Sequence, residues 1–164
     1  MALAVLTSSL LACGGRTHDQ EEGCYALTPV RPSGIIRDDC QLLADAAANL
    51  GARLVVSGNV VELEFRFSTP SQGELLTVSM AGNFAYNEEV FSADGTATNI
   101  QLPIGGQTCQ LQLVNVHLDA TTQSSTEFSG QIRISTTTPT PEACICQAWF
   151  EYQATLSPNG SLCP

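Results

Sequence analysis

Two cysteines, Cys144 and Cys146, stand two residues apart near the end of the chain. Residues with this spacing on a β-strand project to the same face, so the two sulfur atoms could serve a metal ion, a redox couple or two disulfide bonds. A metal site needs further ligands, and the whole chain contains only two histidines. The spacing therefore favours disulfide bonds to separate partners, and we expect one of them to join this pair to Cys109.

Other residues of catalytic type are scattered along the chain. His117 falls toward the end of an expected strand, and the sequence contains neither a G-x-S-x-G turn nor an H-E-x-x-H motif. His18 lies in a polar stretch that fixes no coordination geometry, and we interpret Asp38-Asp39 and Glu88-Glu89 as solvated acidic pairs. The residues thus predict a protein without catalytic side chains, metal or cofactor.

Trp149, the single tryptophan, falls on the polar face of its expected strand, between the inward-facing Ala148 and Phe150. If the outer face of the domain binds a ligand, Trp149 is the expected contact for a sugar or a protein partner. The alternative is that a helix or a loop covers its ring.

The opening stretch MALAVLTSSLLA carries no charge and is shorter than the roughly 20 apolar residues that span a bilayer. It has the character of the apolar part of a signal peptide. The four residues Leu10, Leu11, Ala12 and Cys13 resemble the lipobox of bacterial lipoproteins, and Gly14 follows them.

The resemblance implies a modification of Cys13. In that family the chain is cleaved before this cysteine, a diacylglycerol is attached to its sulfur through a thioether, and a further acyl chain such as palmitate is usually added to the new amino group. Gly14 would be the second residue of the mature chain, and in this position it resembles the residue found in lipoproteins that are sent to the outer membrane. The membrane would then be a partner through the covalent lipid on Cys13, because several acyl chains hold a protein where one does not.

The number of cysteines agrees with this use of Cys13. Seven is an odd number, and an odd thiol in an exported protein needs a special role. The six candidates for three disulfide bonds are Cys24, Cys40, Cys109, Cys144, Cys146 and Cys163. We expect Cys163 to tie down the C-terminal segment.

The length of 164 residues suits one domain. The formal charge of −10 repels nucleic acid, so no nucleic-acid partner is expected. We divide the chain into a signal peptide over 1–12, a flexible polar tether over 13–23 and a single disulfide-stabilised β domain over 24–164.

The domain is expected to be all-β, with one short α-helix near residues 39–50. The helix is predicted from Asp38 or Asp39 as its N-cap, from apolar residues on one side of CQLLADAAANL, and from Gly51 after its end. From Ala52 onward the apolar residues alternate with polar ones, as in NVVELEFRF, and this pattern is typical of half-buried antiparallel strands.

About eight such strands, separated by turns, predict an antiparallel meander that forms either a barrel or a two-sheet sandwich. A barrel is favoured, because each strand is followed by its expected neighbour. The alternation changes phase near Val114, which indicates a β-bulge.

The sequence therefore favours a lipid-anchored lipoprotein of the bacterial cell envelope, located at the outer membrane, with a binding or structural role and no enzymatic activity. Its other partner would be an envelope protein or a small apolar ligand. The alternative is a lipocalin-like carrier whose interior, lined by residues such as Phe65, Phe67, Met80 and Phe84, holds an apolar molecule. An envelope hydrolase using acidic residues has the least support.

Overall fold

The computed structural model describes residues 19–44, 48–69, 73–86, 89–137 and 142–158. Strands make up most of these residues, and the single helical element is the short 3-10 turn η1. The elements are β1 (Gly23–Pro29), β2 (Ile35–Asp38), β3 (Asn49–Ser57), β4 (Val60–Thr69), β5 (Gly73–Phe84), β6 (Val90–Ile104), β7 (Gln107–Ser124), β8 (Glu127–Thr136), η1 (Glu142–Cys144) and β9 (Gln147–Leu156).

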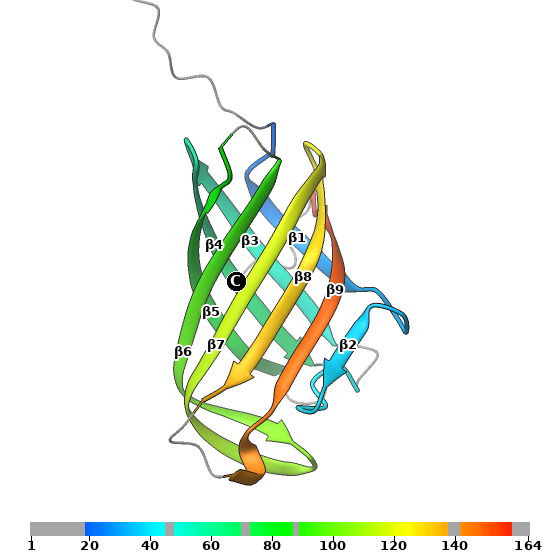
Figure 1. Ribbon diagram of the computed structural model, residues 1–164, viewed down its shortest axis with the longest axis vertical. Coiled ribbons are helices and arrows are strands. Elements are labelled where there is room, and N and C mark those ends of the chain that lie inside the picture. Colours follow the sequence, from blue (N-terminus) through cyan, green and yellow to red (C-terminus); the bar gives the residue numbers. More distant parts are fainter. Residues whose placement is uncertain (1–18, 45–47, 70–72, 87–88, 138–141, 159–164) are drawn as a thin grey trace, which may run out of the picture.

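Eight of the strands form a closed antiparallel barrel (Figure 1). Neighbours along the chain pair from β3 to β9, β1 pairs with β3, and the pairing of β1 with β9 closes the ring. Alternate residues point inward and are buried, so the strand pattern read from NVVELEFRF produces one apolar interior. The expected β meander is confirmed, and it is a barrel rather than a sandwich.

The ninth strand, β2, continues the line of β1 along the same neighbour. The upper part of β9 pairs with β1, from Tyr25 opposite Leu156 to Pro29 opposite Tyr152. The lower part of β9 pairs with β2, which ends with Asp38 opposite Ala148. Residues 30–34 leave the wall between the two segments.

Residues 19–22 enter β1 at the upper end of the barrel (Figure 1). Aromatic rings fill this end. Phe128 contacts three of them, with ring centroids 4.8 Å from Tyr25, 5.3 Å from Phe91 and 6.0 Å from Tyr152. Gln20 lies over this cluster with 0 % of its surface exposed, and its Nε2 donates to the Tyr25 hydroxyl at 2.7 Å. This end is closed by side chains that contact one another without covalent links between them.

Residues 19–23 belong to the stretch that the sequence assigns to a flexible tether, and the structure corrects that assignment for them. Gln20 is buried, the amide of Glu21 donates to the Ser125 carbonyl at 2.8 Å, and Gly23 begins β1. The polar composition of the stretch suggested exposure to solvent, but a polar side chain can be buried when it is hydrogen-bonded, as the amide nitrogen of Gln20 is in the barrel mouth. In the described residues, no helix has the length and apolar character needed to cross a membrane.

The lower end is built from longer segments. The hairpin of β6 and β7 extends past the strands beside it and curls across the lower end of the barrel (Figure 1). It changes direction at Asn99, whose φ is 55°, and the inward-facing series of β7 shifts there from Leu111 to Val114. The change of phase near Val114 is present, but the β-bulge that the sequence predicts there is not. The register of β6 and β7 is the same on both sides of Asn99, from Thr98 opposite Leu113 to Ile100 opposite Leu111, so neither strand carries an extra residue.

The predicted helix near residues 39–50 is wrong for the residues that the structure describes. Asp38 does accept hydrogen bonds from the amides of Leu42 (3.0 Å) and Leu43 (2.9 Å), as a helix cap would. The turn does not continue as a helix, because Gln41 has a φ of 56° and β3 already begins at Asn49.

The apolar spacing that suggested the helix has another cause. Leu42 and Leu43 are buried in the turn, and Leu50 is buried from β3. All three belong to the barrel core, so tertiary packing overrides the local helix propensity of the segment. Residues 45–47 lie outside the described part of the chain.

Candidate functional site

The outer wall of the barrel carries a row of side chains that the strand register places side by side. Asp94 on β6 lies opposite His117 on β7, His117 lies opposite Arg133 on β8, and Arg133 lies opposite Trp149 on β9. These residues occupy outward positions, since the residues that flank them along each strand belong to the interior face. Four strands thus bring one acid, two basic groups and the tryptophan together.

The row borders an open groove of about 880 Å³ on the outer wall, which we call the outer groove. Its charged lining consists of Arg53, Glu62, Glu64, Asp94, His117 and Arg133. Between these lie small side chains such as Ser79, Ala81 and Ser135. The volume falls in the range of roughly 300–1,000 Å³ that is usual for small-molecule sites.

His117 is held between two carboxylates. Its Nδ1 lies 2.6 Å from Oδ1 of Asp94, and its Nε2 lies 3.2 Å from Oδ2 of Asp119. Partial burial of the ring lowers the pKa of His117, but the hydrogen bond to Asp94 and the charges of Asp119 and Asp94 outweigh this effect, so the pKa is raised. When the ring is protonated, both of its nitrogens can donate to these carboxylates.

Trp149 is half-buried on the outer wall, as its strand position predicts. The guanidinium carbon of Arg133 lies 4.3 Å from the centre of its ring, and its Nε1 donates to Oε1 of Gln131 at 3.2 Å. The cover over its ring is therefore the side chain of Arg133 rather than a helix. Its role as a contact for a sugar or a partner stays a prediction.

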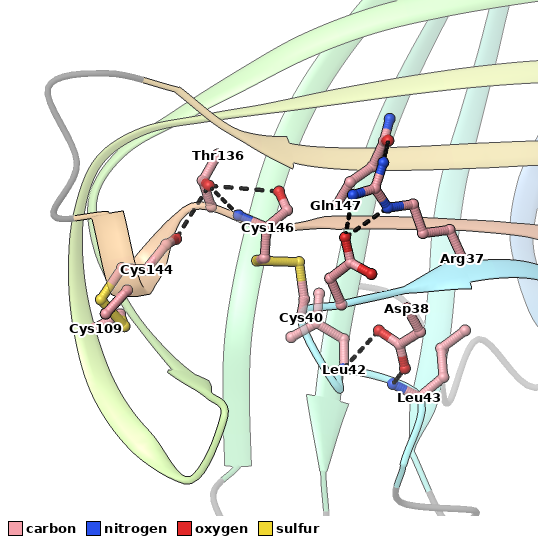
Figure 2. The surroundings of a disulfide bond; sticks show 12 residues. Arg37, Asp38, Cys40, Leu42, Leu43, Cys109, Thr136, Cys144, Cys146 and Gln147 are labelled. Atoms are coloured by element: carbon pink, nitrogen blue, oxygen red, sulfur yellow. Dashed lines mark hydrogen bonds and ion pairs between the residues drawn. A yellow bond between two sulfur atoms is a disulfide. The ribbon is translucent and has the colours of Figure 1, made fainter.

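The disulfide bonds meet at the lower end of the barrel. Cys144 is bonded to Cys109 near the tip of the long hairpin, and Cys146 is bonded to Cys40 in the turn after β2 (Figure 2). The expected bond between Cys109 and the closely spaced pair is confirmed. Cys40 anchors a turn rather than the predicted helix.

A single threonine organises the backbone between the two disulfides. The amide of Cys146 donates to Oγ1 of Thr136 at 2.9 Å, and that hydroxyl donates to the carbonyl of Cys144 at 3.1 Å (Figure 2). The side chains of Cys144 and Cys146 therefore point from the same short segment toward different partners. Two cysteines with this spacing form two disulfide bonds here rather than a metal site.

The remaining cysteines are described only in part. Cys24 is also disulfide-bonded. Cys13 and Cys163 lie outside the described residues, as do the signal peptide, His18 and Glu88. In the part of the chain that the structure describes, no three His, Cys, Asp or Glu side chains are arranged to hold a metal ion.

The acidic pairs have separate local roles. Asp38 binds the backbone of the turn that follows it (Figure 2), and Asp39 forms an ion pair with Arg37. Glu89 is exposed, and its carbonyl accepts a hydrogen bond from the amide of Thr122 at 2.8 Å.

The aromatic and methionine side chains named for the carrier alternative face the interior, as expected. The exposed fractions of Phe65, Phe67, Met80 and Phe84 lie between 0 and 4 %. They belong to one continuous apolar core with the rest of the inward-facing residues.

Sequence reasoning did not find the outer groove. Its charged residues were visible as the polar half of each alternating strand, for example Glu62 and Glu64 in NVVELEFRF. That pattern says which residues point outward but not which residues of other strands lie beside them. The register that joins Asp94, His117 and Arg133 exists only once β6, β7 and β8 have paired with one another.

Comparison with known proteins identifies a similar fold but no family. No family model matches the chain, and no curated protein matches its sequence. The solved structure of EF1p2_mFAP2b bound to DFHBI is similar to this barrel, with a TM-score of 0.51 and 9 % sequence identity, over 83 % of this chain and 93 % of that chain. At this low identity the similarity establishes the barrel fold alone.

Proposed function

We propose that this protein is an exported lipoprotein of the bacterial envelope, attached to the outer membrane through lipid on Cys13 and acting by binding rather than by catalysis. The observation that carries the proposal is the state of the cysteines. All five cysteines in the described residues, Cys24, Cys40, Cys109, Cys144 and Cys146, are in disulfide bonds. Disulfides of this density are typical of an oxidising compartment outside the cytoplasm.

The pairing also supports a separate role for Cys13. The amide of Ser157, just after β9, donates to the carbonyl of Cys24 at 2.7 Å. This contact brings Ser157 beside Cys24. Ser157 precedes Cys163 by six residues in the sequence. We infer a third bond between Cys24 and Cys163, which leaves Cys13 as the seventh cysteine, available for a thioether to lipid.

The anchor would give the barrel an orientation. Residues 19–22 lie at the upper end, and Asp19 follows Cys13 by six residues. The upper end would therefore be held near the membrane, and the lower end with its two disulfides would point away from it. The acidic domain needs no basic patch for this attachment, because the acyl chains supply the affinity for the bilayer.

The test is membrane fractionation of a Cys13→Ser variant expressed in a bacterium that processes lipoproteins. We expect the wild-type protein in the membrane fraction and the variant in the soluble fraction. Cys163→Ser is the matched control, since it removes a cysteine without removing the lipid, and it should stay with the membrane. Membrane retention of Cys13→Ser would contradict the proposal.

A carrier of an apolar small molecule is the second candidate, favoured by the similarity to a barrel solved with DFHBI bound. Titration with DFHBI tests it directly. A saturable rise in fluorescence that is lost in Met80→Trp, which fills the interior beside Leu63, would support the carrier. A signal that does not saturate, or that survives this substitution, would exclude an interior site for this probe.

A further inference from the structure

We propose that the outer groove binds a neutral, polyhydroxylated ligand, that is, a saccharide. The inference rests on the binding role proposed above and adds the place and the chemical class of the ligand. It depends on the charge balance of the groove, on the hydrogen-bonding groups that its side chains leave unused, and on the fixed position of Arg133.

The charges that line the groove balance one another. Glu62, Glu64 and Asp94 supply three negative charges, and two arginines supply two positive ones. A protonated His117 supplies the third, and the carboxylate of Asp119, just outside the lining, contacts its Nε2 and brings the sum to −1. The chain as a whole carries −10, so a groove this close to neutral is a local exception that strongly favours neither anions nor cations.

The groove also keeps hydrogen-bonding capacity in reserve. Within the described residues, the side chains of Arg53, Arg133, Glu62 and Glu64 form no hydrogen bond or ion pair with another side chain. Arg53 and Glu64 lie opposite each other on β3 and β4, so a donor and an acceptor stand next to each other. Vicinal hydroxyl groups can donate to the carboxylate and accept from the guanidinium at the same time.

Arg133 is held in place before any ligand arrives. Its guanidinium lies over the ring of Trp149, and the hydrogen bond to Gln131 fixes that ring. A planar guanidinium stacked on an aromatic face keeps its N–H groups free at the edge. This arrangement limits the side-chain entropy lost on binding, which is the main cost for a long charged side chain.

The floor of the groove leaves room for a ring. Ser79, Ala81 and Ser135 are small, and Val55 adds an apolar contact at one side. A sugar ring presents hydroxyl groups at its edge and C–H groups on its faces, and the groove offers charged partners together with small and apolar surfaces. A charged ligand would leave part of this balanced set of partners unpaired.

The experiment is isothermal titration of the full-length protein in a detergent without a sugar head group. The probes are maltotriose, cellotriose and triacetylchitotriose, with trigalacturonate as a charged comparison. We expect saturable binding of at least one neutral trisaccharide, weakened at least tenfold by Arg133→Gln and by Glu64→Gln. Arg66→Gln and Glu151→Gln are matched controls on the outer wall beyond the groove, and they should bind like the wild type.

Three results would overturn the inference. They are no saturable binding of any neutral trisaccharide, tighter binding of trigalacturonate than of the neutral probes, and equal binding by the groove variants and the controls. Failure of the anchor is a separate result, because a soluble wild-type protein in the fractionation test leaves this titration unchanged.

Discussion

The two ends of the barrel are closed in different ways. At the upper end the turns are short, and Phe128 with the three aromatic rings that it contacts fills the mouth beneath Gln20. At the lower end a long hairpin, a turn and η1 cross the opening, and two disulfide bonds join them. Cys24 is also disulfide-bonded, but it faces outward from the start of β1 and does not close the interior.

The difference follows from how far each segment departs from the strand ladder. Upper turns such as Gly58-Asn59 connect strands that are paired up to the turn itself, so the backbone is already positioned. The lower segments have fewer neighbours in the barrel wall. β6 pairs with β5 only from Phe91 to Gly95, so the lower part of the β6–β7 hairpin pairs only within itself, and β2 has only a short pairing with β9. The two disulfide bonds hold these segments in place of neighbouring strands, and they reduce the entropy of the unfolded chain.

Removal of one disulfide should have the largest effect. Cys40 and Cys146 are 106 residues apart in sequence. A loop of this size corresponds to about 4.8 kcal/mol in the free energy of unfolding, so the double variant Cys40→Ala/Cys146→Ala should lose most of that amount. Urea denaturation without reductant measures the change, and hydrogen exchange should rise in the turn after β2 before it rises at the upper end.

The Cys109→Ala/Cys144→Ala variant is the comparison for that result. Its separation of 35 residues corresponds to a smaller loss of about 3.8 kcal/mol. A loss below about 1 kcal/mol for both double variants would mean that packing alone holds the lower end, as it does the upper one.

Phe128→Ala tests the upper end. The substitution removes a ring that contacts Tyr25, Phe91 and Tyr152 and leaves a cavity, so we expect a loss of about 4 kcal/mol in the free energy of unfolding. Thermal and urea denaturation measure it. The lower-end disulfides should not compensate, and a loss under about 1 kcal/mol would show that the ring cluster does not close this end.

Tyr25→Phe separates the hydrogen bonds of the upper end from its packing. The hydroxyl accepts from Gln20 and donates to the carbonyl of Glu21 at 2.7 Å, and it is removed here without loss of the ring. We expect a loss of about 1–2 kcal/mol, because the Glu21 carbonyl loses a partner. Urea denaturation of Tyr25→Phe and Phe128→Ala under the same conditions compares the two losses in the free energy of unfolding. Equal losses would contradict the expectation that the hydrogen bonds contribute less than the packing.

His117 lies between the two ends and should have the smallest effect. Its folded-state pKa is raised, so its contribution to stability is complete below its unfolded pKa of about 6.5 and is lost as the pH rises through the folded value. The site is partly exposed, which keeps the contribution below about 1 kcal/mol. The wild type should lose this amount between pH 5.5 and pH 8.5 relative to His117→Gln. Identical pH profiles of the two proteins would contradict a stabilising interaction of His117 with Asp94 and Asp119.

The sequence predicted the barrel wall better than its ends. Alternation in segments such as Val61 to Phe67 follows from the geometry of one strand, and it indicated both the strands and the interior face. The change of phase near Val114 was visible for the same reason, because it is a local signal, but it does not mark the predicted bulge.

The segments that cross the ends could not be predicted in the same way. The turn over residues 39–44 has the apolar spacing of a helix, yet its form depends on Cys146 and on core residues far away in the sequence. The outer groove depends on the register of six strands, which no single strand encodes. Long-range partners decided both regions, and local patterns carry no information about them.

Intact-mass spectrometry of the protein recovered from bacterial membranes, before and after reduction, tests the central claim most directly. The account predicts a chain that begins at Cys13, carries two or three acyl chains and gains about six hydrogens on reduction, with Cys24 linked to Cys163 in the disulfide map. A chain without lipid, or a bond between Cys24 and Cys13, would contradict it.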